Sequence, residues 1–378
     1  MPTILIAKET ASGERRVAGT PETVKKMVKA GLEVVYEPGC GVEAGFLDAA
    51  YEQAGARPAG DPVDTWGRAD AVLKVTPPEP VQLARLRSGA ILVSLVDPYR
   101  NLPLVKMLVD RGVTSFAMEL VPRVTRAQEM DVLSSQASIA GYKAVLLAGL
   151  RLGKYFPLLM TAAGTIQPSR IIVLGAGVAG LQAIATAKRL GAVVEVSDIR
   201  AEVKEQVESL GGKFIELPEM QSGAASGGYA KEVTPEFLDK QRAILKQRLA
   251  AADVAITTAQ VPGKKAPILL TREMVEAMKP GSVVVDIAAS SGGNCELTQL
   301  DRDVVHHNVL ILGPGNLPAT MATDASILFA RNVLNFLMLN WKDNQLSVHD
   351  EDEIVAGTLL TRDGKIVHPG VAKAAGAA

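Results

Sequence analysis

The stretch that most restricts how this chain can fold is residues 170–200, RIIVLGAGVAGLQAIATAKRLGAVVEVSDIR. Its first five residues predict a buried strand, residues 181–190 have helical spacing, and a second apolar run ends at Asp198. A short turn that contains glycines joins the first strand to the helix. Strand, glycine turn, helix and strand in this order predict the first βαβ unit of a Rossmann-type parallel sheet.

Three glycines lie in the turn, and each has its own physical reason. Gly175 permits the tight turn out of the strand, Gly177 lets the backbone approach a pyrophosphate, and Gly180 allows the helix to pack close to the sheet. Ala176 and Val178 lie between them, where unpaired N–H groups at the helix start would bind the pyrophosphate. We therefore predict a dinucleotide site at these five residues. The alternative is a glycine-rich turn that binds no ligand.

The acid at the end of the second strand indicates which dinucleotide would bind. The carboxylate of Asp198 can accept hydrogen bonds from both adenosine ribose hydroxyls, whereas a 2′-phosphate there would meet a like charge. Ile199 and Arg200 complete this part of the site. Arg200 is evidence for NADP(H), because an arginine just past the strand could accept a 2′-phosphate. On balance these residues favour NAD(H) over NADP(H).

Composition excludes several classes of protein. With 378 residues the chain is long enough for two domains, and a formal net charge of −1 without a basic block predicts no nucleic-acid partner. No window of eighteen apolar residues predicts a membrane span, and the amino terminus does not resemble a signal peptide. Cys40 and Cys295 lack metal-type spacing, so we expect free thiols in a reducing cytoplasm and no metal site.

The fold class follows from repeated strand–helix alternation on both sides of the fingerprint. Residues 1–135 show it without a glycine turn, and a helix is predicted where Pro21 opens the run TPETVKKMVKAG. We predict an α/β protein with two Rossmann-like, doubly wound parallel sheets separated by a cleft. The first domain would comprise residues 1–135, joined by 318–378, and the dinucleotide-binding domain would comprise residues 136–317.

Two segments depart from this alternation. Residues 218–236 are rich in Gly, Ser and Ala, and their aromatic residue, Tyr229, could close over a ligand; the alternative is a surface insertion without function. The tail, residues 346–368, alternates like a β-hairpin with its turn at residues 363–364.

The motifs resemble the alanine dehydrogenase and nicotinamide nucleotide transhydrogenase family over nearly the whole chain. Within it they are most similar to the soluble NAD(H)-binding component of the proton-translocating transhydrogenase, the first portion of a split alpha subunit. The similar segments are the opening AKE…GERRVAGTPETVKKM, PRVTRAQEMDVLSSQ, MTAAGT, GAGVAGLQAIATAKRLGA, GGYAKE and KPGSVVVDIA…GGN.

The resemblance implies a second group of site residues. The segment PRVTRAQEMDVLSSQ resembles the transhydrogenase loop that holds the nicotinamide end of NAD(H), which implies roles for Arg123, Gln128, Asp131 and Ser134. An Arg–Asp pair would fix the loop, and the glutamine and serine would bind the carboxamide and ribose. Tyr229 matches the family's mobile loop. Without the resemblance, the same segment could be a helix start with an incidental charge pair.

The resemblance also implies partners. Transhydrogenase moves a hydride between NAD(H) on this component and NADP(H) on another, coupled to proton passage through a membrane-spanning subunit. This chain has only one dinucleotide fingerprint, so it would need both partners. The family implies a homodimer that attaches peripherally to the cytoplasmic face of the inner membrane.

Two other functions are compatible with the fold. An amino-acid dehydrogenase of the alanine dehydrogenase type needs an acid–base group, usually histidine, but the segment LVSLVDPYR that should carry it has none. Arg16 and Lys74 match the family's substrate-carboxylate residues, although they could be scaffold ion pairs, and Asp286 matches a catalytic acid. The other alternative is a protein that binds NAD(H) without catalysis.

Overall fold

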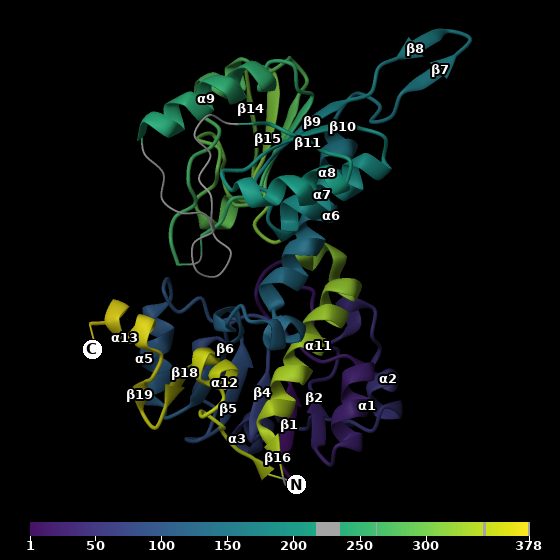
Figure 1. The fold of residues 1–378 in the computed structure, drawn as a ribbon. Coiled ribbons are helices and arrows are strands. Elements are labelled where there is room, and N and C mark those ends of the chain that lie inside the picture. The colour runs from purple at the N-terminus through teal and green to yellow at the C-terminus, as the bar shows by residue number, and fades with distance from the viewer. Residues whose placement is uncertain (217–234, 262, 343–344, 377–378) are drawn as a thin grey trace. The chain divides into compact units, whose positions relative to one another are not determined.

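The computed structural model describes residues 1–216, 235–261, 263–342 and 345–376 (Figure 1). The predicted loop 218–236, with Tyr229, lies outside the described residues except for its last two positions, which begin a helix. The chain divides into two compact units: unit 1 comprises Met1–Gln136 and Ala319–Ala378, and unit 2 comprises Ala137–Pro318.

Unit 1 is built on one sheet with the strand order β19-β18-β6-β5-β4-β1-β2-β3. Its pairs from β6 to β3 are parallel, and β18 and β19 add an antiparallel edge. The strands are β1 (Thr3–Ile6), β2 (Glu33–Tyr36), β3 (Arg57–Pro58), β4 (Ala71–Leu73), β5 (Ile91–Ser94), β6 (Thr114–Ala117), β18 (Leu359–Arg362) and β19 (Lys365–Ile366).

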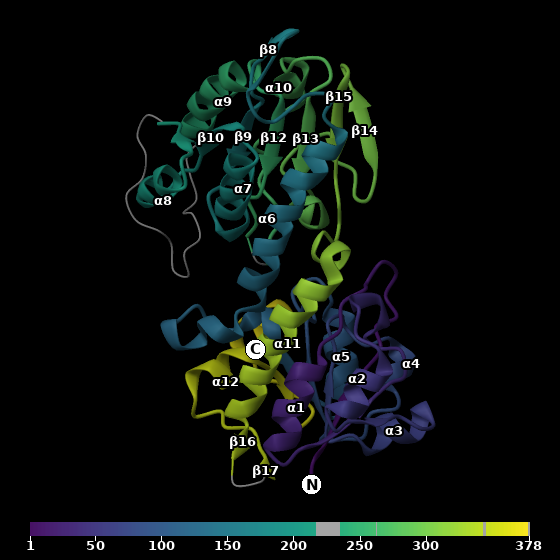
Figure 2. The ribbon, with the colours of Figure 1, turned by 90° about the vertical axis from the view of Figure 1, so that its right-hand side faces the viewer.

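Helices pack on both faces of this sheet, and several of them are labelled in the lower part of Figure 2. One apolar cluster joins the sheet to α1 (Pro21–Lys29), α2 (Asp48–Gln53), α11 (Ala322–Leu339) and α12 (Glu353–Thr358). The opposite cluster joins it to α3 (Pro62–Arg68), α4 (Pro80–Leu83), α5 (Leu102–Asp110) and α13 (Pro369–Ala374). Strands buried on both faces are apolar at consecutive positions, which explains the run Ile-Leu-Val over residues 91–93 of β5.

Unit 2 has the strand order β11-β10-β9-β12-β13-β15-β14, and all its pairs are parallel except β14 with β15. The strands are β9 (Arg170–Leu174), β10 (Val193–Ser197), β11 (Lys213–Phe214), β12 (Val254–Thr257), β13 (Val283–Asp286), β14 (Asp303–His306) and β15 (Val309–Leu312). The α/β class with two predominantly parallel sheets is therefore confirmed.

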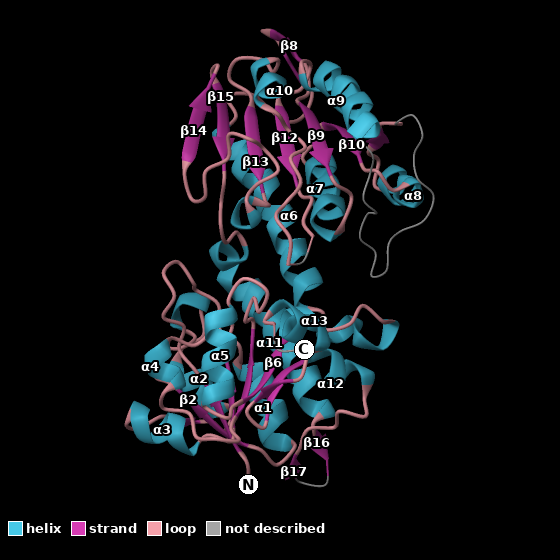
Figure 3. Cartoon of the chain, turned by 90° about the vertical axis from the view of Figure 1, so that its left-hand side faces the viewer, coloured by secondary structure: helices cyan, strands magenta, loops and turns pink. Residues whose placement is uncertain are grey.

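The two faces of this sheet also have separate apolar clusters, and Figure 3 shows the strands of the sheet with the helices beside them. One contains α6 (Val132–Arg151), α7 (Val178–Arg189) and α8 (Lys204–Ser209), and the other contains α9 (Pro235–Leu249) and α10 (Arg272–Glu276). Helix α6 packs closely on α7 at Gly141. A Cβ at this position would lie 2.0 Å from the carbonyl oxygen of Ala179, so only glycine fits there. Among the described residues, no helix is both long and apolar enough to cross a membrane.

Short elements complete the two units. A hairpin of β7 (Leu159–Thr161) and β8 (Gly164–Ile166) extends away from the sheet of unit 2 (Figure 1). A smaller hairpin in unit 1 pairs β16 (Trp341–Lys342) with β17 (Gln345–Leu346). The 3₁₀ turns are η1 (Val42–Ala44), η2 (Met118–Leu120), η3 (Thr125–Met130), η4 (Ala201–Val203), η5 (Ala289–Ser291) and η6 (Pro318–Met321).

The prediction for the tail is wrong in its first half. Instead of one hairpin over residues 346–368, helix α12 occupies Glu353–Thr358, and only β18 and β19 form a hairpin. The turn at residues 363–364 is where the sequence predicts it, with positive φ at both positions. The helix forms because the Asp352 carboxylate accepts a hydrogen bond from the Ile354 N–H and the next apolar residues are buried against the sheet.

Candidate functional site

The dinucleotide fingerprint lies at the topological switch point of unit 2. Strand β9 is central: the chain continues from it to β10 on one side, whereas β12 pairs with its other side. In open parallel sheets, ligands bind at the carboxyl ends of the strands where the order reverses in this way. The turn that follows β9 is residues 175–177, so the fold alone puts these glycines at the preferred binding position.

The three glycines have different structural requirements. Gly175 has φ +105°, and a Cβ there would lie 2.5 Å from Thr258 Oγ1. A Cβ at Gly180 would lie 1.9 Å from the carbonyl oxygen of Gly175, so helix and strand pack too closely for any side chain. At Gly177, by contrast, a Cβ would meet no atom within 4 Å, and φ is −79°. The fold therefore requires the outer two glycines, while the space over Gly177 is open and fits a close-approaching ligand.

The open glycine is also the N-cap of α7. Gly177 has no side chain that could accept a hydrogen bond from the first N–H groups of the helix, and Val178, the first helical residue, is exposed. Helix α7 is twelve residues long, so its dipole adds a partial positive charge at this end. The arrangement suits an anionic group such as a pyrophosphate.

Asp198 closes the site from the end of β10. Its carboxylate is buried, and Oδ2 accepts a hydrogen bond of 2.7 Å from the Ala176 N–H, which ties the acid to the glycine turn. Burial by itself would raise the pKa of Asp198, but the hydrogen bonds from Arg200 and Ala176 outweigh burial and hold the pKa below its ordinary value. The acid is therefore ionised at neutral pH, as recognition of ribose hydroxyls requires.

Arg200 is bound to the same carboxylate. Its backbone N–H and Nε donate to Oδ1 at 2.9 and 3.0 Å, and its Nη2 donates to Oδ2 at 2.8 Å. The pair hydrogen bond raises the pKa of the Arg200 guanidinium further. Asp198 thus holds the one cation that the sequence suggests for a 2′-phosphate. Ile199, between them, is only partly buried and packs with the cluster on the α9 side.

The four residues of the nicotinamide loop come together in unit 1. Arg123, Gln128, Asp131 and Ser134 all line one open pocket of about 410 Å³, formed by η3 and the first turn of α6. Asp131 accepts hydrogen bonds from the backbone N–H of Ser134 at 2.9 Å and from its hydroxyl at 2.6 Å. Asp131 therefore acts as a cap for α6. The Arg123–Asp131 pair stays a prediction.

Contacts from the carboxyl-terminal segment of unit 1 fix this loop. Asn332, on α11, donates to the carbonyl oxygen of Glu129 at 2.7 Å and accepts from Ser135 Oγ at 2.7 Å. Arg126 forms two hydrogen bonds of 2.7 Å with Asp352, which lower the pKa of that carboxyl to about 2. Sequence patterns assigned none of these residues a role. The one sequence signal that could have indicated this contact is Asn332, a polar residue that interrupts the apolar run of α11.

The two substrate-carboxylate candidates are bound in ion pairs. Lys74 is fully buried, with its Nζ 3.1 Å from the carboxylate of Glu9. Arg16 is buried as well; it forms two side-chain hydrogen bonds with Glu14 and donates to Gln136 Oε1 at 2.8 Å. These contacts favour the scaffold interpretation that the sequence left open.

Asp286 also has a structural environment. The carboxylate is fully buried at the end of β13 and accepts five hydrogen bonds, three from backbone N–H groups and two from threonine hydroxyls. One of these is from Cys295, whose thiol is buried, as is that of Cys40. With these five hydrogen bonds Asp286 holds the η5 loop to the end of β13.

No histidine is among the residues that line the pocket in unit 1. His306 ends β14 and His307 begins the turn after it, and both face Glu276 in unit 2. His349 contacts a neighbouring glutamate, and His368 accepts a hydrogen bond from the first turn of α13. Each histidine is therefore engaged elsewhere.

Comparison with known proteins agrees with this geometry. The family description "Alanine dehydrogenase/PNT, N-terminal domain" matches residues 5–140, and "Alanine dehydrogenase/PNT, C-terminal domain" matches residues 144–369. The chain therefore belongs to the alanine dehydrogenase/PNT family.

Within the family, the transhydrogenase members are the more similar group. The first portion of the split NAD(P) transhydrogenase alpha subunit of Rhodospirillum rubrum is 50% identical over 97% of this chain and 98% of its own length. A transhydrogenase structure from Sinorhizobium meliloti matches with a TM-score of 0.89 and 45% identity, covering 97% of this chain and 100% of that one. Alanine dehydrogenase of Bacillus subtilis is 30% identical over 97% of this chain and 93% of its length. The resemblance to the first portion of the transhydrogenase alpha subunit is confirmed.

Proposed function

We propose that this chain is the NAD(H)-binding component of a proton-translocating transhydrogenase. Residues 136–317 would bind NAD(H), with the pyrophosphate at residues 175–180 and the adenosine ribose at Asp198. The observation that carries the proposal is Gly177, since the fold leaves open space above it at the switch point of the sheet. A turn without a ligand would need the other two glycines but not this one.

The loop of residues 123–134 would hold the nicotinamide end. Bound NADH would supply the hydride, and the NADP⁺ that accepts it would be held by a partner subunit. Gln128 and Ser134 offer an amide and a hydroxyl to the carboxamide and ribose, and Asp131 keeps Ser134 oriented. Direct transfer between nicotinamides moves no proton, so the site needs positioning residues rather than an acid–base pair. The absence of histidine from the pocket lining supports this reaction.

The remaining partners follow from the proposed reaction. We infer a membrane-spanning subunit, which would couple hydride transfer to proton translocation, and peripheral attachment of this chain to the cytoplasmic face of the inner membrane. The names of the transhydrogenase relatives, each one portion of an alpha subunit, support an assembly of several subunits. A homodimer is supported by the projecting β7–β8 hairpin, where Leu158, Met160 and Ile166 are exposed.

An amino-acid dehydrogenase is the second candidate, because an alanine dehydrogenase shares the fold with a TM-score of 0.84 at 28% identity. The ion pairs of Lys74 and Arg16 speak against it, since binding a substrate carboxylate would require breaking a buried pair. The third candidate, NAD(H) binding without catalysis, shares the glycine site and differs only in having no hydride acceptor.

The deciding experiment measures hydride transfer from NADH to an NADP⁺ analogue, with this chain mixed with its candidate NADP(H)-binding partner. Controls omit each protein in turn and offer pyruvate with ammonium instead. Transfer only with both proteins present is the expected result. NADH consumption by pyruvate and ammonium without a partner would overturn the proposal in favour of a dehydrogenase. NADH binding with no acceptor in any mixture would favour the non-catalytic function.

A further inference from the structure

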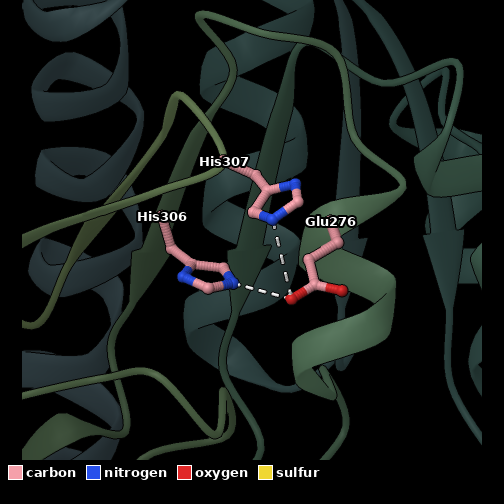
Figure 4. A group of neighbouring side chains, drawn as sticks. All are labelled: Glu276, His306 and His307. Carbon is pink, nitrogen blue, oxygen red and sulfur yellow. Dashed lines mark hydrogen bonds and ion pairs between the residues drawn. The ribbon is translucent and has the colours of Figure 1, made fainter.

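A cluster of one carboxylate and two imidazoles lies in unit 2, apart from the glycine turn. Glu276, at the end of α10, faces both His306 and His307, and one ligand atom from each residue lies within 4.8 Å of the others (Figure 4). His306 Nε2 is 2.8 Å from Glu276 Oε1, and His307 Nε2 is 4.0 Å from the same oxygen. Both rings therefore approach one carboxylate oxygen.

The backbone explains how adjacent histidines come to face the same way. Successive residues of a strand project to opposite faces, so His306 and His307 would diverge if β14 continued. Instead, His307 and Asn308 have φ of +48° and +58°, and they form the two-residue turn between β14 and β15. The turn brings the second ring back beside the first, with ring centroids 4.9 Å apart.

The turn is anchored next to the helix that carries the carboxylate. The Gly281 N–H, just beyond α10, donates to the carbonyl oxygen of Asn308 at 2.7 Å, and the Leu310 N–H donates to the carbonyl oxygen of Ser282 at 2.9 Å. These bonds set the distance between the hairpin tip and Glu276 without any contribution from the three side chains. The cluster is thus placed by the sheet itself.

We propose that Glu276, His306 and His307 form a binding site for a divalent transition-metal ion, with Zn²⁺ as the reference ion. Two neutral imidazoles and one carboxylate suit Zn²⁺, Cu²⁺ or Ni²⁺, whereas Mg²⁺ and Ca²⁺ prefer oxygen ligands alone. In a tetrahedral zinc site the ligand atoms lie about 3.3 Å apart, so modest side-chain rotations bring the three donors into place. A fourth position stays open to water.

Exposure and charge are compatible with metal entry. The side chains of His306 and Glu276 are 24% and 33% exposed, and that of His307 is 62% exposed, so an ion reaches the donors directly from solvent. Arg272, one turn earlier on α10, is the neighbouring cation that acts on Glu276. The positive charge of Arg272 disfavours a metal ion at this position, and the negative charge of Glu276 offsets that repulsion.

The site is separate from the proposed nucleotide site within unit 2. The hairpin turn lies at the amino end of β15, which runs parallel to β13, whereas the glycine turn follows the carboxyl end of β9. Moreover, β14 is the edge strand, four positions along the sheet from β9. Metal binding should therefore leave NADH affinity unchanged, so the two proposals can fail independently.

The test is a calorimetric titration of the metal-free full chain with ZnCl₂. We expect one Zn²⁺ per chain, and at least about tenfold weaker binding in each of His306→Gln, His307→Asn and Glu276→Gln. Asparagine tolerates positive φ, so His307→Asn removes the ligand and keeps the turn. His349→Gln is the matched control, because His349 also pairs with a glutamate but has no second histidine beside it, and it should bind zinc like the wild type.

A second measurement identifies the ligands. The electron paramagnetic resonance spectrum of bound Cu²⁺ should show coupling to two imidazole nitrogens in the wild type and to one in His306→Gln. The cysteines should not compete, because burial raises the pKa of Cys40 to about 12 and that of Cys295 to about 11. The proposal is overturned if the wild type binds no zinc, if His307→Asn binds it with wild-type affinity, or if zinc displaces NADH.

Discussion

The two units have the same central strand order but use its switch point differently. In unit 1 the reversal lies between β1 and β4, and in unit 2 it lies between β9 and β12. At the first, the carboxylate of Glu9 accepts hydrogen bonds from the backbone N–H groups of Val75 and Thr76 and from Lys74 Nζ. At the second, a glycine turn leaves open space over Gly177.

This difference shows what topology contributes and what it does not. A reversal of strand order creates a crevice at the carboxyl ends of the strands in both units. In unit 1 the chain fills the crevice with its own buried ion pair, and in unit 2 it presents a helix start and an acid. The shared fold alone would assign both units the same function. Which unit binds a ligand is therefore decided by the residues at each crevice.

The largest expected effect is at the filled crevice. Lys74→Met should lower the free energy of unfolding by about 3–5 kcal/mol, because it leaves the Glu9 carboxylate buried without its cation. Urea unfolding measures the loss, and the double variant Lys74→Met with Glu9→Gln should recover most of it. A single variant as stable as the wild type would show that the pair does not hold this crevice closed.

The second effect concerns Glu119, a half-buried residue that lies in η2, directly after β6 in unit 1. Its Oε1 accepts a hydrogen bond from the Val96 N–H at 2.8 Å, but its Oε2 is buried with no partner in the described residues of the chain, and burial raises its pKa to about 7. The folded state therefore binds this proton more tightly than the unfolded state does. Its contribution to stability is fully present below the ordinary pKa of 4.5 and is lost as pH rises through 7.

Glu119→Gln should remove that loss. Its free energy of unfolding relative to wild type should rise by roughly 2–3 kcal/mol between pH 4.5 and pH 8. At pH 4.5 the two proteins should be nearly equal, which serves as the internal control. Parallel stability profiles over this range, from urea unfolding, would show that Glu119 does not take up a proton on folding.

The third prediction separates two glycines of the open crevice. Gly180→Ala should destabilise unit 2 by about 1–3 kcal/mol, because its Cβ would overlap the carbonyl oxygen of Gly175. Gly177→Ala should leave the melting temperature of the free protein unchanged and weaken NADH binding at least about tenfold, or 1.4 kcal/mol. Thermal melting and NADH titration of both variants test this. Unimpaired NADH binding by Gly177→Ala would favour a turn that binds no ligand.

The smallest expected effect is a change of nucleotide preference. Asp198→Asn should weaken NADH binding by roughly five- to tenfold, about 1 kcal/mol, and should strengthen NADPH binding, because it removes a like charge and releases Arg200 toward the 2′-phosphate. Fluorescence titration with both nucleotides measures the change. Adding Arg200→Ala should abolish the gain with NADPH. Unchanged affinities for both nucleotides would remove the argument for NAD(H).

Much of the fold and some of the candidate site could be predicted because the signals are local. The glycine turn, its helix and Asp198 lie within thirty residues, and burial on both faces makes the parallel strands visible as apolar runs. The residues of the nicotinamide loop came from the family resemblance, and the structure gathers all four around one pocket. By contrast, α12 was missed because it is only six residues long and contains the β-branched residues Ile354 and Val355, which favour strands.

The sequence by itself determined the class of fold, the family and the position of the glycine turn, since each rests on residues close together along the chain. Only the tertiary structure decided which charges are already paired. Glu9 and Lys74 are 65 residues apart, and Arg126 and Asp352 are 226 apart, so no local pattern relates them. The same holds for Glu276 and His306, 30 residues apart, which meet because a hairpin turn packs beside a helix end. Such pairings depend on how the sheet orders its strands, and that order is a property of the folded chain.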